Sequence, residues 1–149
     1  MNNQEINVPV VAPLLRIKGG DTDAAVQAHG ALHFKQDGVL VWGVAADAAE
    51  WDLTGVDLAA GEMCVVGLYA EQIVATATNT YSIVATDPKA FAYTSAYKTG
   101  ELPSEVPGKA LIGWVVIVNA TNPFVGGTTE LDAAGVNCNF FDNFGFAGM

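Results

Sequence analysis

The segment from Gly108 to Asn119 constrains the fold of this chain more than any other. It is the longest near-continuous apolar run in the sequence and is rich in β-branched residues, and Pro107-Gly108 and Thr121-Asn122-Pro123 bound it with turn signals. A run of this length and composition between turns is typical of a strand rather than a helix. We therefore expect a central strand that is buried on both faces, with Trp114 as a core residue.

Short apolar segments make up the rest of the chain, with turn signals about every 8 to 12 residues. Asp37-Gly38 separates two of them and favours a tight hairpin turn. A second hairpin is expected within Ile73–Thr86, with its turn at Thr78–Thr80. Asp87-Pro88 and Gly100 could begin and end one helix. This pattern predicts an all-β fold, a β-sandwich or small barrel of about seven to eight strands with an extended N-terminal arm and at most one short helix.

The expected domain organisation is an arm followed by a single domain. Residues 1–23 predict an extended N-terminal arm, because Pro9 and Pro13 remove backbone donors and favour extended geometry. Residues 24–149 predict a single β domain with a Phe-rich C-terminal tail. Arm and tail are too apolar to be left in water, so we expect them to pack on their own domain or on a neighbouring subunit. The candidate interface residues are Val8, Val10, Val11, Leu14, Leu15, Ile17, Phe140, Phe141, Phe144 and Phe146.

Composition narrows the possible partners. The formal charge is −10, and such a surface repels a phosphate backbone, so we expect no direct nucleic-acid partner. Only 15% of the residues are charged, against about 25% in an average domain, which suggests that self-association covers part of the surface. No stretch approaches the length of a membrane span, and the first residues lack the basic region of a signal peptide. We expect synthesis in the cytoplasm and no membrane partner.

No recognisable catalytic motif is present, and we expect no enzyme, no catalytic residue and no cofactor. The sequence has neither a phosphate-binding loop nor a nucleophile elbow. His29 and His33 fall on an expected strand, where four residues separate them by about 13 Å, so both are interpreted as structural. Cys64 and Cys138 show no metal-like spacing and are expected to be free thiols.

Metal binding and glycosylation are weakly indicated. Asp21 and Asp23, or Glu130 and Asp132, could offer oxygen ligands to a cation, but neither pair belongs to an EF-hand-like series. We therefore expect no metal site. Asn119-Ala120-Thr121 fits the glycosylation sequon and is interpreted as incidental.

The C-terminal third carries a resemblance to a known family. Its segments are Leu102-Pro103, Gly108–Gly113, Phe124–Thr129 and Leu131–Val136, with a looser likeness at Asp37-Gly38 and Ala60–Glu62. This combination resembles small structural proteins of tailed bacteriophages, of the head-decoration or cement type. The resemblance implies a β-rich homotrimer in the virion. Its partner would be the major capsid protein, on whose outer surface it would stabilise the expanded head against the pressure of the DNA.

An alternative from another functional class is also open. A receptor- or glycan-binding module, such as a head-fibre or tail-tip domain, would display aromatic side chains to its ligand. Trp51 lies between two acidic residues and is expected to be the most exposed tryptophan. The candidate glycan contacts are Trp51, Tyr93 and Tyr97.

Overall fold

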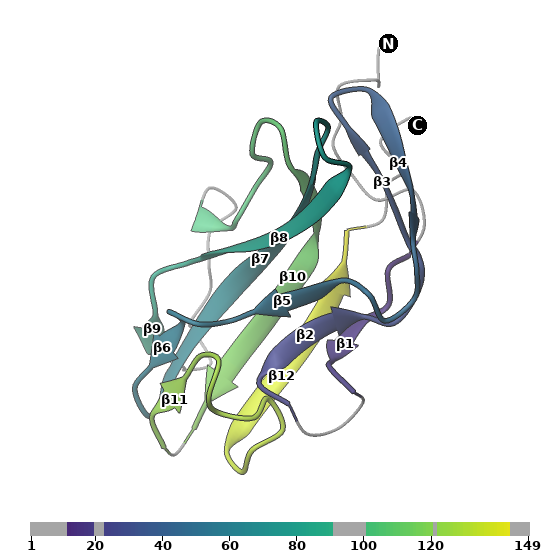
Figure 1. Ribbon diagram of the computed structural model, residues 1–149. Coiled ribbons are helices and arrows are strands. Elements are labelled where there is room, and N and C mark those ends of the chain that lie inside the picture. Colours follow the sequence, from purple (N-terminus) through teal and green to yellow (C-terminus); the bar gives the residue numbers. More distant parts are fainter. Residues whose placement is uncertain (1–11, 20–22, 91–100, 121, 144–149) are drawn as a thin grey trace.

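The protein is built from two layers of antiparallel strands. The computed structural model describes residues 12–19, 23–90, 101–120 and 122–143. The strands are β1 (Leu15–Ile17), β2 (Ala25–Ala28), β3 (Leu32–Gln36), β4 (Val39–Val44), β5 (Glu50–Asp52), β6 (Asp57–Leu58), β7 (Glu62–Ile73), β8 (Thr78–Ala85), β9 (Lys89–Ala90), β10 (Ala110–Asn119), β11 (Phe124–Val125) and β12 (Val136–Asp142). In Figure 1, a sheet in the order β12-β10-β7-β8 lies behind a sheet in the order β1-β2-β5.

The remaining strands complete the sandwich-like arrangement. β3 and β4 form one pair, β6 and β11 form another, and β9 adds to β7. The described residues contain no α-helix and no closed barrel, which confirms the prediction of an all-β fold. Within the same ranges, no helix is long and apolar enough to cross a membrane.

β10 is the central strand that the sequence predicts, and it pairs with β7 on one side and β12 on the other. A bulge between Leu111 and Gly113 shifts its register near the start. Beyond the bulge the side chains alternate, and Val115 and Ile117 are buried in the core. Trp114 and Val116 point to the other face and are half-buried. The prediction of burial on both faces is therefore wrong for the outer face, and Trp114 does not belong to the core.

Trp51 occupies the core between the two layers. Its side chain is fully buried, its Nε1 donates to the carbonyl oxygen of Tyr69 at 2.9 Å, and its ring meets Tyr81 edge-on at 5.3 Å. The prediction that Trp51 is exposed is wrong. Glu50 and Asp52 flank it in a strand, where alternate side chains point to opposite faces, so their exposure places Trp51 inward.

The first predicted hairpin is confirmed. Asp37 and Gly38 have φ angles of 49° and 79°, the positive pair that a type I′ turn between β3 and β4 requires. Gln36, which precedes the turn, anchors this hairpin to the large sheet. Its amide donates to the carbonyl oxygen of Gln72 and accepts from the Gln72 N–H, so the side chain replaces a neighbouring strand there.

The second hairpin is displaced from its predicted position. β7 continues to Ile73, the turn lies at residues 74–77, and the expected turn at Thr78–Thr80 is the first part of β8. Val74 is 83% exposed at this tip, and Ala77 has a φ of 52°. β-branched residues favour a strand only where they can pack against neighbouring side chains. Val74 has no such packing at the exposed tip, so its strand preference does not extend β7.

The predicted helix and arm are only partly within the described residues. Lys89–Ala90 form β9 against Glu62–Met63, so the expectation of a helix starting after Asp87 is wrong there, and residues 91–100 lie outside the described ranges. β1 pairs with β2, so residues 15–17 belong to the domain rather than to a separate arm. Residues 1–11 and 144–149 lie outside the described ranges.

Substitution of Trp51 by Phe tests the core. The variant loses the hydrogen bond to Tyr69 and leaves a small cavity, so we expect the free energy of unfolding to fall by about 1–3 kcal/mol in urea denaturation. Val74→Ala at the exposed hairpin tip is the control, with an expected change within about 0.5 kcal/mol. Equal stability of the Trp51→Phe and unmodified proteins would contradict the buried position.

Candidate interaction surface

The face of the large sheet that points away from β1, β2 and β5 is its outer face. Strand alternation places the side chains of Trp114 and Val116 on this face of β10. Their cross-strand partners are Gly67 and Val65 on β7, and Phe141 and Asn139 on β12. The outer face is therefore continuous over three hydrogen-bonded strands.

A segment from Glu101 to Gly108 runs against this face near Trp114. The Nε1 of Trp114 donates to the carbonyl oxygen of Pro103 at 3.0 Å, and the Tyr69 hydroxyl donates to the carbonyl oxygen of Ser104. Gly67 permits the close approach, because a Cβ atom at that position would lie 2.5 Å from the Cβ of Pro103. The indole is thus held in place by its polar edge.

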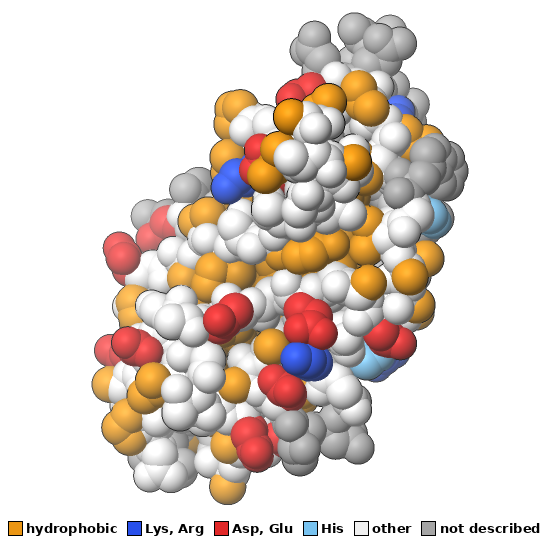
Figure 2. Space-filling view, viewed as in Figure 1, with side chains coloured by type: hydrophobic (Ala, Val, Ile, Leu, Met, Phe, Trp, Pro, Cys, Tyr) orange, Lys and Arg blue, Asp and Glu red, His pale blue; other side chains and the backbone are white. Residues whose placement is uncertain are grey.

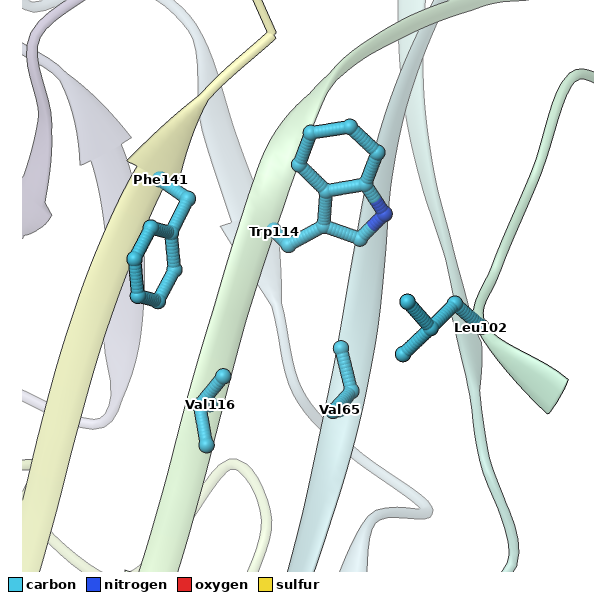
Figure 3. Close-up of a pocket in the computed structure, with 5 residues that line it drawn as sticks. All are labelled: Val65, Leu102, Trp114, Val116 and Phe141. Atoms are coloured by element: carbon cyan, nitrogen blue, oxygen red, sulfur yellow. The ribbon is translucent and has the colours of Figure 1, made fainter. Parts of the chain in front are cut away.

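An apolar depression of about 320 Å³ lies between this segment and β12. Figure 3 shows the Trp114 ring between Phe141 on one side and Leu102 on the other, with Val65 and Val116 below. Phe141 is 53% exposed and Leu102 is 37% exposed. Exposed apolar side chains gathered around one hollow, rather than scattered singly, are typical of an interaction site.

The depression can bind a partner through apolar contacts and shape complementarity. The five lining side chains include no titratable group, and the indole N–H is already bonded to Pro103. Partner atoms that enter it would gain free energy from the apolar area removed from water, about 25 cal/mol per Å². Its chemistry suits an apolar side chain of another protein.

The structure disperses the predicted interface residues. Leu15 is buried in the core, and Ile17 and Phe140 pack against that core from partly exposed positions. Leu14 is 47% exposed, and Phe141 is the one predicted interface residue that lines the depression. The predicted residues that lie outside the described ranges are Val8, Val10, Val11, Phe144 and Phe146.

The glycan contacts are not brought together in the described residues. Trp51 is fully buried, so it cannot reach a ligand, and this assignment is wrong. Tyr93 and Tyr97 lie outside the described ranges. The exposed aromatic residue of the large sheet is instead Phe141.

The sequence analysis did not predict four of the five lining residues as contacts, namely Val65, Leu102, Val116 and Trp114, the last of which it assigned to the core. Val65 and Val116 lie in near-continuous apolar runs, where no period-2 alternation separates the core-facing from the outward-facing positions. Leu102 lies in an irregular segment that follows residues 91–100 and contains Pro103 and Pro107. The one available signal was Leu102-Pro103 itself, an apolar residue in an extended dipeptide.

The remaining candidate chemistry is structural where it is described. His29 contacts the carbonyl oxygen of Ile17 through Nε2 and the carboxylate of Asp47 through Nδ1, each at 3.0 Å. No group of three metal-ligating side chains occurs within the described ranges. Asn119 is buried, with its amide nitrogen bonded to the carbonyl oxygens of Ala59 and Asn122, so it cannot serve as a glycosylation acceptor in the folded chain.

The opposite face of the molecule is acidic. Figure 2 shows Asp and Glu side chains spread over the face that carries β2 and β5, with few basic ones among them. Lys18 pairs with Glu50 at 3.0 Å, and this hydrogen bond raises the pKa of Lys18. Hydrogen bonds from Thr54 lower the pKa of Asp52 and keep it ionised. Acidic groups therefore gather on the front layer, whereas the five side chains that line the depression carry no charge.

Comparison with protein-family models, curated proteins and solved structures gave no significant match.

The two thiols predict a pH dependence of stability. Cys64 and Cys138 are free and flank Ile117 from its two neighbouring strands, and burial raises the pKa of each from 9.0 to about 12. The unfolded chain releases these protons near pH 9, whereas the folded chain keeps them. Their contribution to stability is therefore complete below pH 9 and is lost as the pH rises toward 12. Urea denaturation between about pH 8 and 10.5 should show this decline, and Cys138→Val should reduce it. An identical slope in that variant would exclude the thiol as a cause.

Gly67→Ala tests the packing of the Pro103 segment. The added methyl group would collide with Pro103, so we expect a loss of about 1–3 kcal/mol in unfolding free energy and a change in Trp114 fluorescence. Pro103→Gly removes the colliding Cβ atom. In a double-mutant cycle, Gly67→Ala should therefore lower the unfolding free energy less in the Pro103→Gly protein than in the unmodified protein. Additive effects would show that the two residues are not in contact.

Proposed function

We propose that the protein is a non-enzymatic structural protein of a tailed-bacteriophage virion, of the head-decoration type. It binds the outer surface of the head as a homo-oligomer and stabilises the capsid. The single observation that carries the proposal is the apolar depression around Trp114, with Phe141 and Leu102 exposed at its two sides. The family resemblance of the C-terminal third supplies the phage context.

The geometry supports binding to a large protein surface. The depression rests on three paired strands, and its tryptophan is fixed by a hydrogen bond, so little conformational entropy is lost on binding. One such contact is modest in free energy. A capsid presents many equivalent sites, and an oligomer that engages several of them at once gains avidity without new contacts.

The distribution of charge supports the same proposal. The protein carries a formal charge of −10, and the five side chains around the depression carry none. The acidic groups would keep copies soluble before assembly and favour an approach in which the uncharged depression meets the capsid. The major capsid protein is the proposed partner, and the capsid surface of the virion is the proposed location.

Binding to expanded, empty heads of the phage that encodes the protein tests the proposal. Leu102→Glu places a charge at the depression, and we expect its Kd for heads to rise by about tenfold or more, because one buried apolar side chain contributes about 1.5–3 kcal/mol. Val39→Glu is the matched control, since Val39 is 63% exposed on β4, away from the depression. Occupancy would be measured by co-sedimentation, and head stability by thermal melting.

The outcomes separate the proposal from its rival. Saturable binding of the unmodified protein and of Val39→Glu, with weakened binding of a folded Leu102→Glu, supports it. Failure of the unmodified protein to bind heads, together with saturable binding to host cells or a glycan array, would replace it with the receptor-binding alternative. Equal occupancy by Leu102→Glu would exclude the depression as the contact.

A further inference from the structure

β12 is an edge strand whose second side is open. It pairs with β10 along its whole length, and no other strand of the described part of the chain pairs with it. β1 comes close only at one end, where the backbone N–H groups of Leu14 and Leu15 donate to the Asp142 carboxylate at 3.2 and 3.1 Å. A groove of about 530 Å³ separates the start of β1 from the β12 edge. Within the described ranges, no second strand takes up the outward backbone donors and acceptors of this edge.

The edge lacks the usual devices against strand pairing. Natural edge strands carry lysine, proline, inward-pointing charges or bulges that prevent association. Between Asp132 and Asp142 the sequence has no charged residue and no proline, and the β10–β12 register is free of bulges. Asn137 and Asn139 are exposed on this strand. β12 is therefore a strand of seven residues that carries no protecting charge before Asp142, its last residue.

Charge favours a second copy of this chain as the occupant. Two molecules of formal charge −10 repel each other, and an approach at β12 brings together strands whose residues 136–141 are uncharged, with Asp142 at the end and Arg16 of β1 beside the groove. In the antiparallel register of full overlap, Val136 lies opposite Asp142, Asn137 opposite Phe141, and Asn139 opposite itself. The two Asp142 carboxylates then lie at opposite ends of the shared ladder. Each remains bonded to its own Leu14 and Leu15.

We propose that β12 pairs in antiparallel orientation with β12 of a second copy, about a two-fold axis at Asn139. The pairing joins two five-stranded sheets into one of ten strands. An axis perpendicular to the sheet leaves both outer faces on the same side, so the two Trp114 depressions face one surface. This pairing does not depend on the proposed capsid function, although two depressions on one side would suit a bivalent contact.

Native mass is the first measurement. Light scattering on a sizing column at two concentrations should give about twice 15.5 kDa, near 31 kDa. Asn139→Lys places two ammonium groups directly opposite each other, so it should raise the concentration at half-dissociation by about tenfold or more. Asn137→Lys is the matched control, because it would face Phe141 rather than its own copy and should weaken the pair less. A mixture of Asn139→Lys with Asn139→Asp should recover the dimer.

Cross-linking gives a second readout that does not require dissociation. Asn139→Cys should form an intermolecular disulfide readily under mild oxidation near pH 8, because directly opposed Cβ atoms lie about 4.5–5.5 Å apart, close to disulfide geometry. Asn137→Cys should form it much more slowly. Cys64 and Cys138 stay protonated at that pH, since their pKa values are about 12.

Contrary results are equally distinct. A monomer at both concentrations would overturn the pairing, as would a stable mass of about three times 15.5 kDa that Asn139→Lys leaves unchanged. Equal cross-linking at positions 137 and 139 would exclude the register. Urea denaturation of each variant checks that the fold is retained. Head binding by a monomeric protein would overturn the pairing and the homo-oligomeric state, while leaving the proposed binding to the capsid intact.

Discussion

The ladder between β7 and β10 is the constraint on which the rest of the structure depends. It joins residues 62–70 to residues 110–119, so forming it closes a long loop, and this costs entropy. Apolar burial on the core side offsets that cost, where Val66, Leu68, Val115 and Ile117 are almost inaccessible to solvent. β8 and β12 then extend the sheet on its two sides, and the smaller layer covers one face. The other face is left to Trp114 and the Pro103 segment.

Sequence pattern predicted the fold class and some local elements for clear physical reasons. The Asp37-Gly38 turn follows from two residues that tolerate positive φ angles, and β10 follows from a long β-branched run between turn signals. The exchanged roles of Trp51 and Trp114 show the limit of such reasoning. Trp51 lies among charged neighbours, and Trp114 among apolar ones. In strands, however, the face is set by alternation and by the second layer, and that layer's position is a tertiary property.

The candidate site could be anticipated only in part. Phe141 was found because a Phe-rich end to an otherwise polar segment is costly to expose. Leu102 and Val65 approach it from segments distant in the sequence, and their meeting depends on the space that Gly67 leaves for Pro103. The residues of the expected arm were interpreted as one unit. The backbone instead commits Leu15 to the core while Leu14, its neighbour, points to solvent with a φ of 53°.

The few charged residues of the chain are unevenly distributed over the fold. Only 15% of the residues are charged, and Asp23, Glu50 and Asp52 gather beside one another at the front layer. The outward positions of β10 carry none, and β12 carries one charged residue, Asp142, at its end. Association through the front layer would bring carboxylates together, whereas association through the large sheet buries apolar and amide groups. In the proposed assembly, electrostatic repulsion would therefore disfavour contact through the front layer, and the apolar depression and the β12 edge would supply the favourable free energy.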